Sequence, residues 1–107
     1  MNVRFFSLAR HEVDDAVLWY EERAEGLSRE FLDELDRVVR LVRAYPLIAT
    51  QIEPEIRRFL LTRFPYSLIY GIDRETIVVI AVAHQHREPV IGLIAWIGTD
   101  ASVECRN

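Results

Sequence analysis

The longest unbroken apolar run in the chain extends from Ile77 to Ala83. Consecutive apolar residues place side chains on both faces of a strand, so a strand with this sequence has to be buried on both sides. The run is far shorter than the roughly 20 residues that a helix needs to cross a membrane. We therefore expect Thr76 to Ala83 to form the central strand of a sheet.

Three further segments are candidates for its neighbours, because they are rich in β-branched, aromatic and leucine residues. They are Val3 to Leu8, Ile56 to Phe64 and Tyr66 to Ile72, with Pro65 as the break between the last two. Asp73-Arg74-Glu75 is a polar turn before the central strand. Short connections favour antiparallel pairing of the strands that they join.

From Glu12 onward, apolar residues recur at spacings of three and four, which places them on one face of a helix. They are Val13, Ala16, Val17, Tyr20, Ala24 and Leu27. Glu12, Asp14 and Asp15 then fall in the first turn, where the helix dipole favours negative charge. Gly26 is expected to stop this helix.

A second helix is expected directly after it, with Ser28 as the N-cap and Glu30 in the first turn. Its apolar positions are Phe31, Leu35, Val38, Val39 and Val42. Tyr45-Pro46 ends the helix, because a proline disfavours helical geometry in the residue before it. The predicted order is β-α-α-β-β-β, an α+β fold with an N-terminal helical hairpin packed on one face of an antiparallel sheet.

Length and composition set limits on the class of protein. With 107 residues, half of them hydrophobic and 28% charged, the chain suits a single globular domain. Cys105 is the one cysteine, so an intrachain disulfide and a paired-cysteine metal site are excluded. The first residues lack the apolar stretch of a signal peptide. We expect a cytoplasmic protein without a membrane segment.

Charge is unevenly distributed along the chain, and all thirteen basic residues are arginine. Residues 11–36 carry ten acids against two arginines, a net charge of −8, whereas residues 37–87 carry eight arginines against four acids, a net charge of +4. The total of −4 argues against a nonspecific nucleic-acid binder.

The densest group of candidate site residues combines basic side chains from two predicted strands. Arg57, Arg58 and Arg63 lie on the first, and His84, His86 and Arg87 lie at the end of the other. Arginine binds phosphate through paired hydrogen bonds and histidine can transfer a proton, so the group could support RNA cleavage. Taken alone, the pattern equally describes surface arginines and loop histidines.

The remaining motifs argue against a metal site and against a cofactor site. His84-Gln85-His86 has metal-ligand spacing but lacks further ligands, so no metal is expected. Trp19-Tyr20 is better explained by core packing than by an aromatic binding surface. There is no phosphate-binding glycine loop and no GxSxG or HExxH motif, so no cofactor is expected.

Three stretches together resemble the RelE/ParE toxin superfamily, and especially its ParE-like, plasmid-stabilisation branch. They are the helical pair closed by Tyr45-Pro46, the segment Ile56 to Tyr70 with its Arg63-Phe-Pro-Tyr sequence, and Val79 to Pro89 with its His-x-x-Arg-x-Pro ending. The resemblance covers about Val3 to Pro89. It divides the chain into a toxin domain, residues 1–89, and a divergent apolar tail, residues 90–107, within the same domain.

The resemblance implies a growth-inhibiting toxin of a type II toxin–antitoxin system, neutralised by a cognate antitoxin protein. ParE-like members inhibit DNA gyrase, whereas RelE-like members are endoribonucleases that cleave mRNA on the ribosome, so the chain is an enzyme only in the second case. By position, Arg63 and Arg87 correspond best to the basic site residues, followed by Arg58 and His84. Sequence likeness favours the gyrase branch; the ribonuclease, an inactive partner-binding domain and a homodimer stay open.

After Pro89 the sequence departs from the family, whose members in this branch often continue with a Tyr-Trp element. Here an apolar block from Val90 to Ile97 follows. A fifth strand, a short helix that closes the core and an exposed patch are all compatible with this block, and packing within the chain is favoured.

Overall fold

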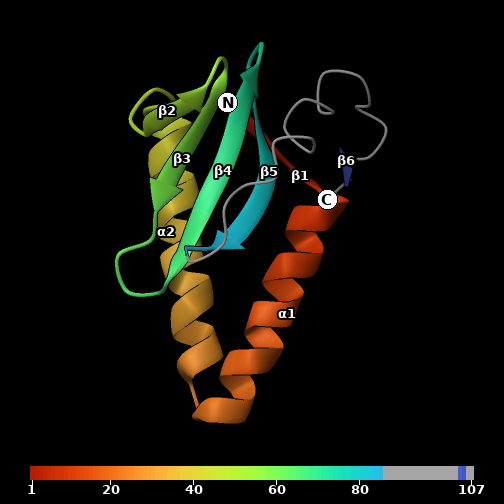
Figure 1. Cartoon of the computed structure of the whole chain (residues 1–107), viewed down its shortest axis with the longest axis vertical. Helices are drawn as coiled ribbons and strands as arrows, with labels where there is room; N and C mark the ends of the chain where they lie inside the picture. Colours follow the sequence, from red (N-terminus) through yellow and green to blue (C-terminus); the bar gives the residue numbers. More distant parts are fainter. Residues whose placement is uncertain (86–103, 106–107) are drawn as a thin grey trace.

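The computed structural model describes residues 1–85 and the short strand formed by residues 104–105. In chain order its elements are β1 (Asn2–Phe6), α1 (Ser7–Arg23), α2 (Leu27–Ala44), β2 (Thr50–Glu53), β3 (Ile56–Leu60), β4 (Tyr66–Asp73), β5 (Thr76–His84) and β6 (Glu104–Cys105) (Figure 1). The predicted β-α-α-β-β-β order is confirmed, with β2 and β6 added to it.

The described strands form one sheet in the order β2-β3-β4-β5-β1-β6. Neighbours from β2 to β5 are antiparallel, as their short connections predicted. Strand β1 pairs with β5 in parallel, with Val3 opposite Ile77. The sheet is therefore mixed, because β1 and β5 are far apart in sequence and no hairpin sets their relative direction.

Strand β5 lies between β4 and β1, which confirms its predicted central place. All residues from Ile77 to Val82 are buried. Val79 and Val82 belong to the apolar cluster that includes the helices, whereas Val78 and Ile80 belong to a second cluster that contains no helical residue. A register shift opposite Ile69 and Tyr70 inserts one residue in β5, so both Ile80 and Ala81 face this second cluster.

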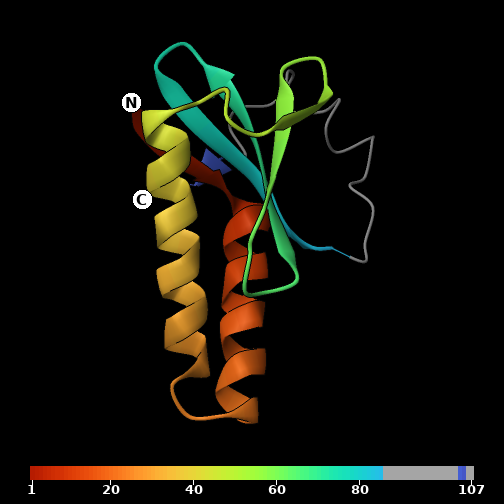
Figure 2. The ribbon, with the colours of Figure 1, turned by 90° about the vertical axis from the view of Figure 1, so that its left-hand side faces the viewer.

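The two helices form an antiparallel hairpin on one face of the sheet, and their connecting loop extends beyond its end (Figure 2). Helix α1 begins at Ser7, so the predictions of a strand to Leu8 and of a helix start near Glu12 were wrong. The helix starts early because Ala9 is fully buried in the helix-side cluster. Consequently no acidic residue occupies its first turn, and the dipole argument for Glu12 does not apply.

Helix α2 begins one residue after Gly26, which adopts a φ of 83°, a backbone conformation that suits glycine. Gly26 therefore caps the second helix, and the predictions that it stops the first helix and that Ser28 is the cap were wrong: α1 ends at Arg23. The predicted end of α2 is confirmed by Tyr45, whose backbone N–H donates to the carbonyl of Leu41.

Strand β3 ends at Leu60, so the prediction that it continues to Phe64 was wrong. Residues 61–65 form a loop instead, and its Leu61 and Phe64 side chains are buried in the helix-side cluster. Apolar residues such as these fit a strand pattern, but a loop that buries them satisfies the same pattern. Strand β2 was missed because Thr50-Gln51-Ile52-Glu53 is short, largely polar and at the sheet edge.

Near the C-terminus, Glu104 pairs with Phe6 and Cys105 with Phe5. The apolar block from Val90 to Ile97, with its three alternative interpretations, lies outside the described residues. Within the described part of the chain, neither helix is long and apolar enough to span a membrane.

Candidate functional site

A buried carboxylate fixes the 61–65 loop to α2. The Glu34 side chain is 6% exposed, and its Oε2 accepts hydrogen bonds from the Thr62 backbone N–H at 3.0 Å and the Thr62 hydroxyl at 2.9 Å. Arg37 donates to both oxygens of the same carboxylate, at 3.1 and 2.9 Å. These charge-assisted bonds set the position of the loop relative to the helix.

The same contacts change the acidity of this side chain. Hydrogen bonds from Arg37 lower the pKa of Glu34 to about 2, with a further contribution from Thr62, although burial acts in the opposite direction. Glu34 is therefore an anion throughout the physiological pH range, with an arginine partner. Its role is to hold the loop in place.

Arg63 lies in this loop, next to Thr62. Its Nη2 is 2.7 Å from a carboxylate oxygen of Glu30 on α2, and its guanidinium carbon lies 5.8 Å from the centre of the Phe64 ring. The Arg63 side chain nevertheless remains 60% exposed. Arg63 is thus a surface cation on a loop that Glu34 holds against α2. Such a guanidinium is suited to contacting a phosphate or a carboxylate of a target.

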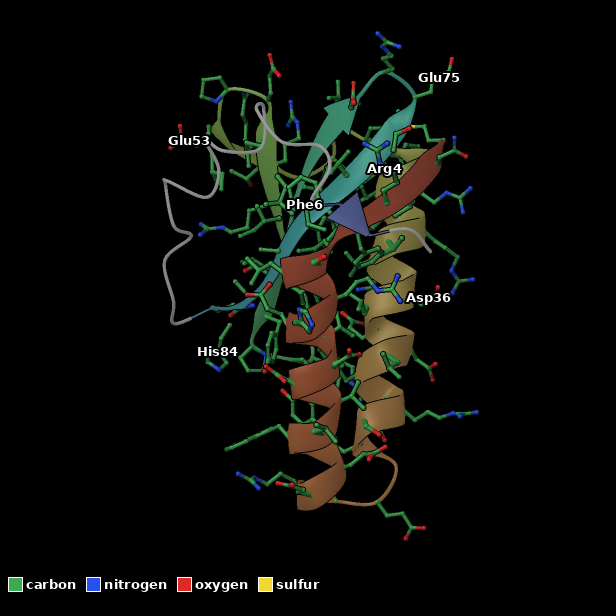
Figure 3. All side chains as sticks on the ribbon, turned by 90° about the vertical axis from the view of Figure 1, so that its right-hand side faces the viewer. Arg4, Phe6, Asp36, Glu53, Glu75 and His84 are labelled. Atoms are coloured by element: carbon green, nitrogen blue, oxygen red, sulfur yellow. The ribbon has the colours of Figure 1, made fainter. Side chains whose placement is uncertain are left out.

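His84 lies at the end of β5, on the side of the sheet next to α1 (Figure 3). It pairs with Tyr66 across the β4–β5 ladder, and the two ring centres are 5.3 Å apart in an edge-to-face arrangement. The following residue, Gln85, donates from its backbone N–H to Pro65 at 2.7 Å and from its side chain to Tyr66 at 3.2 Å. His84 and the loop that carries Arg63 therefore lie at the same end of the sheet.

Arg58 is separated from this pair. It is half-buried on β3 opposite Ile69, on the sheet face that carries Ile56 and the second apolar cluster. The helices and His84 lie on the other face. The prediction that Arg58 and Arg63 share a strand and join His84 is therefore wrong for Arg58, and Arg63 comes from a loop.

Arg57 has a structural role. Its guanidinium donates to the carbonyl oxygens of Ala49, at 2.8 Å, and Leu47, at 3.3 Å, and so holds the connection between α2 and β2. Arg87 and His86 lie outside the described residues. Among the residues that the structure describes, no group of three or more His, Cys, Asp or Glu side chains is arranged to hold a metal ion.

Two carboxylates important to this end of the molecule were missed at the sequence level. Glu34 occupies an inward position between Phe31 and Leu35, and an acid within an apolar stripe is the signal that could have identified it. Glu12 accepts a hydrogen bond from the Val82 backbone N–H at 2.7 Å, beyond the last residues of β1 that pair with β5. Nothing in the sequence pattern distinguishes Glu12 from its acidic neighbours.

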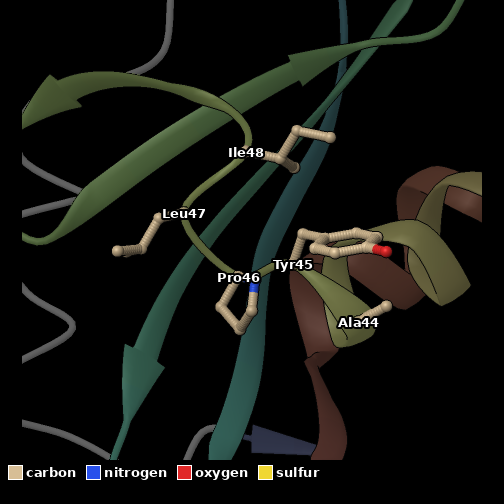
Figure 4. Close-up of a pocket in the computed structure, with 5 residues that line it drawn as sticks. All are labelled: Ala44, Tyr45, Pro46, Leu47 and Ile48. Atoms are coloured by element: carbon tan, nitrogen blue, oxygen red, sulfur yellow. The ribbon is translucent and has the colours of Figure 1, made fainter.

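An open apolar hollow of about 570 Å³ lies at the connection between α2 and β2 (Figure 4). Residues 44–48 line it, and Tyr45 and Leu47 are 62% and 67% exposed. The carbonyl of Pro46, one of the lining residues, accepts a hydrogen bond from the buried Tyr70 hydroxyl at 2.6 Å. The hollow is at the end of α2 remote from Glu30 and Arg63, roughly 20 Å along the helix, and contributes nothing to that site.

A helical hairpin packed on one face of a mostly antiparallel sheet is the fold that the RelE/ParE resemblance predicted. Residues 3–89 match the family described as the ParE toxin of the type II toxin–antitoxin system parDE, and the chain belongs to this family. The predicted resemblance is confirmed.

Comparison with solved structures supports the same fold. The structure of the "Chromosomal ParDE TA system from P. aeruginosa" has a TM-score of 0.57 and 16% sequence identity, covering 78% of this chain and 95% of that chain. At this identity, the likeness concerns the fold. Among curated protein sequences, none matches the chain.

Proposed function

We propose that this toxin arrests growth by inhibiting DNA gyrase, and that a cognate antitoxin neutralises it by binding. The observation that carries the proposal is the ParE family match, which extends over residues 3–89 and includes the Arg63-bearing loop. It favours the gyrase branch of the superfamily over the ribonuclease branch. DNA gyrase as the target places the activity in the cytoplasm.

The geometry supports binding over cleavage. General acid–base cleavage of RNA requires proton-transferring and charge-stabilising groups around one phosphate. Arg58 is on the opposite face of the sheet from His84, and Arg63 is paired with Glu30. Within residues 1–85, the arginines therefore do not surround the histidine as such a reaction requires.

In this proposal, Arg63 and His84 contact the target at one end of the sheet, and Arg87 is a further contact that the family resemblance implies. Arg58 belongs to a separate surface and can contribute only if the target reaches both faces. Residues 1–89 carry the toxic activity, and residues 90–107 complete the same domain.

The test is induction of the chain in a bacterial culture, alone and together with the small protein encoded beside it. We expect growth arrest, loss of negative supercoiling in plasmid DNA from the same cells, and recovery when the neighbouring protein is co-expressed. Arrest with intact supercoiling and cleaved transcripts would replace gyrase with mRNA as the target. Normal growth in the presence of abundant folded protein would indicate an inactive partner-binding domain.

A further inference from the structure

A small cavity lies between α1 and the end of the β4–β5 pair, on the helix side of the sheet. Its volume is about 230 Å³, and its polar and aromatic lining consists of Glu12, Asp15, Trp19, Tyr66 and His84. This volume is below the roughly 300–1,000 Å³ of typical small-molecule sites. The cavity suits one side chain better than a nucleotide or a cofactor.

The charge of the cavity wall selects a cationic occupant. Glu12 and Asp15 supply two carboxylates to its lining, and Arg23 of the same helix contacts the lining residue Trp19. Glu12 is held in place because its carboxylate accepts the Val82 backbone N–H at 2.7 Å. Asp15 lies on the adjacent turn of the same helix, at its exposed surface. The two carboxylates therefore give the cavity a negative wall.

Among cationic groups, the aromatic side of the cavity favours a guanidinium over an ammonium. Trp19 is 52% exposed, so the prediction that it packs in the core was wrong, although it holds for Tyr20. The guanidinium carbon of Arg23 lies 3.5 Å from the centre of the Trp19 ring. This contact shows that the indole accepts a stacked guanidinium, and an incoming one would stack in place of Arg23 or on the other ring face. A planar guanidinium can combine stacking on an aromatic ring with forked hydrogen bonds to carboxylates, which an ammonium group does not match.

The surroundings of the cavity favour a protein as the source of that guanidinium. Leu8, Glu12, Asp15 and Trp19 follow each other at spacings of four, three and four residues, so they form a stripe along one side of α1. Leu8 is 39% exposed, and Leu18, beside the stripe, is 59% exposed. An extended or helical segment could thus cover apolar residues while one of its side chains enters the cavity.

We propose that this cavity is a docking site for an arginine side chain of a protein partner, which lies along the Leu8–Trp19 stripe of α1. The cavity shares His84 with the proposed target surface but does not include Arg63, and the proposal does not depend on gyrase being the target.

The test is an NMR titration of the isotope-labelled full chain with two capped tripeptides, acetyl-Leu-Arg-Leu-amide and its citrulline counterpart, in which the guanidinium is replaced by a neutral isostere. We expect saturable shifts at the Trp19 indole N–H and the backbone of Glu12 and Asp15 with the arginine peptide. The citrulline peptide should leave these signals in place. A Trp19→Phe variant identifies the indole signal, because the chain has two tryptophans.

Two matched variants separate the cavity from the general charge of the helix. Asp15→Asn should lower the affinity for the arginine peptide about three- to fivefold. Asp14→Asn removes the same charge one residue away, outside the cavity lining, and should leave the affinity within experimental error. The proposal would be overturned if both variants lost the same affinity for the arginine peptide, or if the citrulline peptide bound as tightly as the arginine peptide. It would also be overturned if spermine or Mg²⁺ shifted the same signals with equal affinity.

Discussion

Carboxylates on the same helix differ sharply in their effect on stability, according to what surrounds them. Glu34 is buried and accepts hydrogen bonds from both Thr62 and Arg37. Two residues later, Asp36 pairs with Arg40 at 3.1 Å, but these side chains are 64% and 69% exposed. Water competes for an exposed pair, so only the first carboxylate should contribute substantially to folding.

We predict that Glu34→Gln lowers the free energy of unfolding by about 2 kcal/mol near neutral pH. The folded-state pKa of Glu34 is lowered from 4.5 to about 2, so its stabilising effect is complete above about pH 4.5 and is lost as the pH falls through about 2. The difference between wild type and variant should therefore shrink in this acidic window. Urea denaturation at a series of pH values measures it.

Asp36→Asn is the matched control, since it removes one carboxylate charge from the same helix at an exposed site. We expect it to change the free energy of unfolding by less than about 0.5 kcal/mol. A Glu34→Gln effect as small as that of Asp36→Asn would show that the loop is held by other contacts.

A second residue-scale prediction concerns the Tyr70 hydroxyl. Burial raises the pKa of Tyr70, and the hydroxyl donates at 2.6 Å to the Pro46 carbonyl. Tyr70→Phe should destabilise the fold by about 1–2 kcal/mol, because it leaves that carbonyl without this donor. Hydrogen exchange should become faster at the backbone amides of Tyr45, Leu47 and Ile48. Tyr45→Phe, which removes a hydroxyl from a side chain that is 62% exposed, should have no measurable effect on either quantity.

At the scale of whole elements, a helix or strand was predicted correctly where its hydrophobic pattern fits only one kind of secondary structure. The apolar run of β5 and the three- and four-residue spacing in α2 each leave a single way to bury their side chains. The start of α1, the end of β3 and strand β2 were wrong or missed, because the short segments around Leu8, Leu61 and Thr50 fit more than one local structure. Tertiary packing, such as the burial of Ala9, decided among these options.

For the candidate site too, some features were predicted from the sequence and others were not. Sequence spacing correctly placed His84 at a strand end, and the Arg63-bearing loop lies at that end. Alternation along a strand already places Arg58 and Arg63, five residues apart, on opposite faces, so grouping both with His84 was wrong on the sequence pattern itself. What the pattern did not reveal is that the chain leaves the strand after Leu60 and carries Arg63 in a loop. The Glu34 contacts join residues 28 positions apart, a separation that periodicity does not report.

For β5 we predict that Ile80→Asp prevents folding. Ile80 is 1% exposed in the cluster on the sheet face without helices, and a carboxylate there would lose its hydration without gaining a partner. Circular dichroism and the soluble yield would both report the loss. Ile80→Val should cost only about 0.5–1.5 kcal/mol. A soluble Ile80→Asp variant with a native spectrum would contradict the assignment of this face to the core.

At the scale of the whole molecule, opposite charges lie close to the proposed target surface. Residues 11–36, with a net charge of −8, form most of α1 and the first part of α2, and Glu30 from this region pairs with Arg63. An acidic hairpin beside the site opposes general attraction to nucleic acid. Individual arginine contacts with a protein target are consistent with this distribution, whereas nonspecific attraction to DNA is not.

The last prediction separates the folding and functional roles of Arg63. Because Arg63 and Glu30 are 60% and 49% exposed, loss of their ion pair should cost less than about 1 kcal/mol, and Arg63→Ala should remain folded. We expect the double variant Arg63→Ala, Arg87→Ala to lose toxicity when the chain is induced, with each single variant reducing it. Growth curves at matched protein abundance provide the measurement.

Glu30→Ala is the decisive control, because it breaks the same ion pair while leaving the arginine in place. If Arg63 contacts the target, Glu30→Ala should remain toxic, and freeing the guanidinium from its acidic partner could only favour the contact. If Glu30→Ala and Arg63→Ala abolish toxicity equally, the ion pair itself is what matters, and Arg63 acts by shaping the loop. If the double arginine variant is fully toxic, both residues are removed from the target surface, and His84 becomes the next position to change.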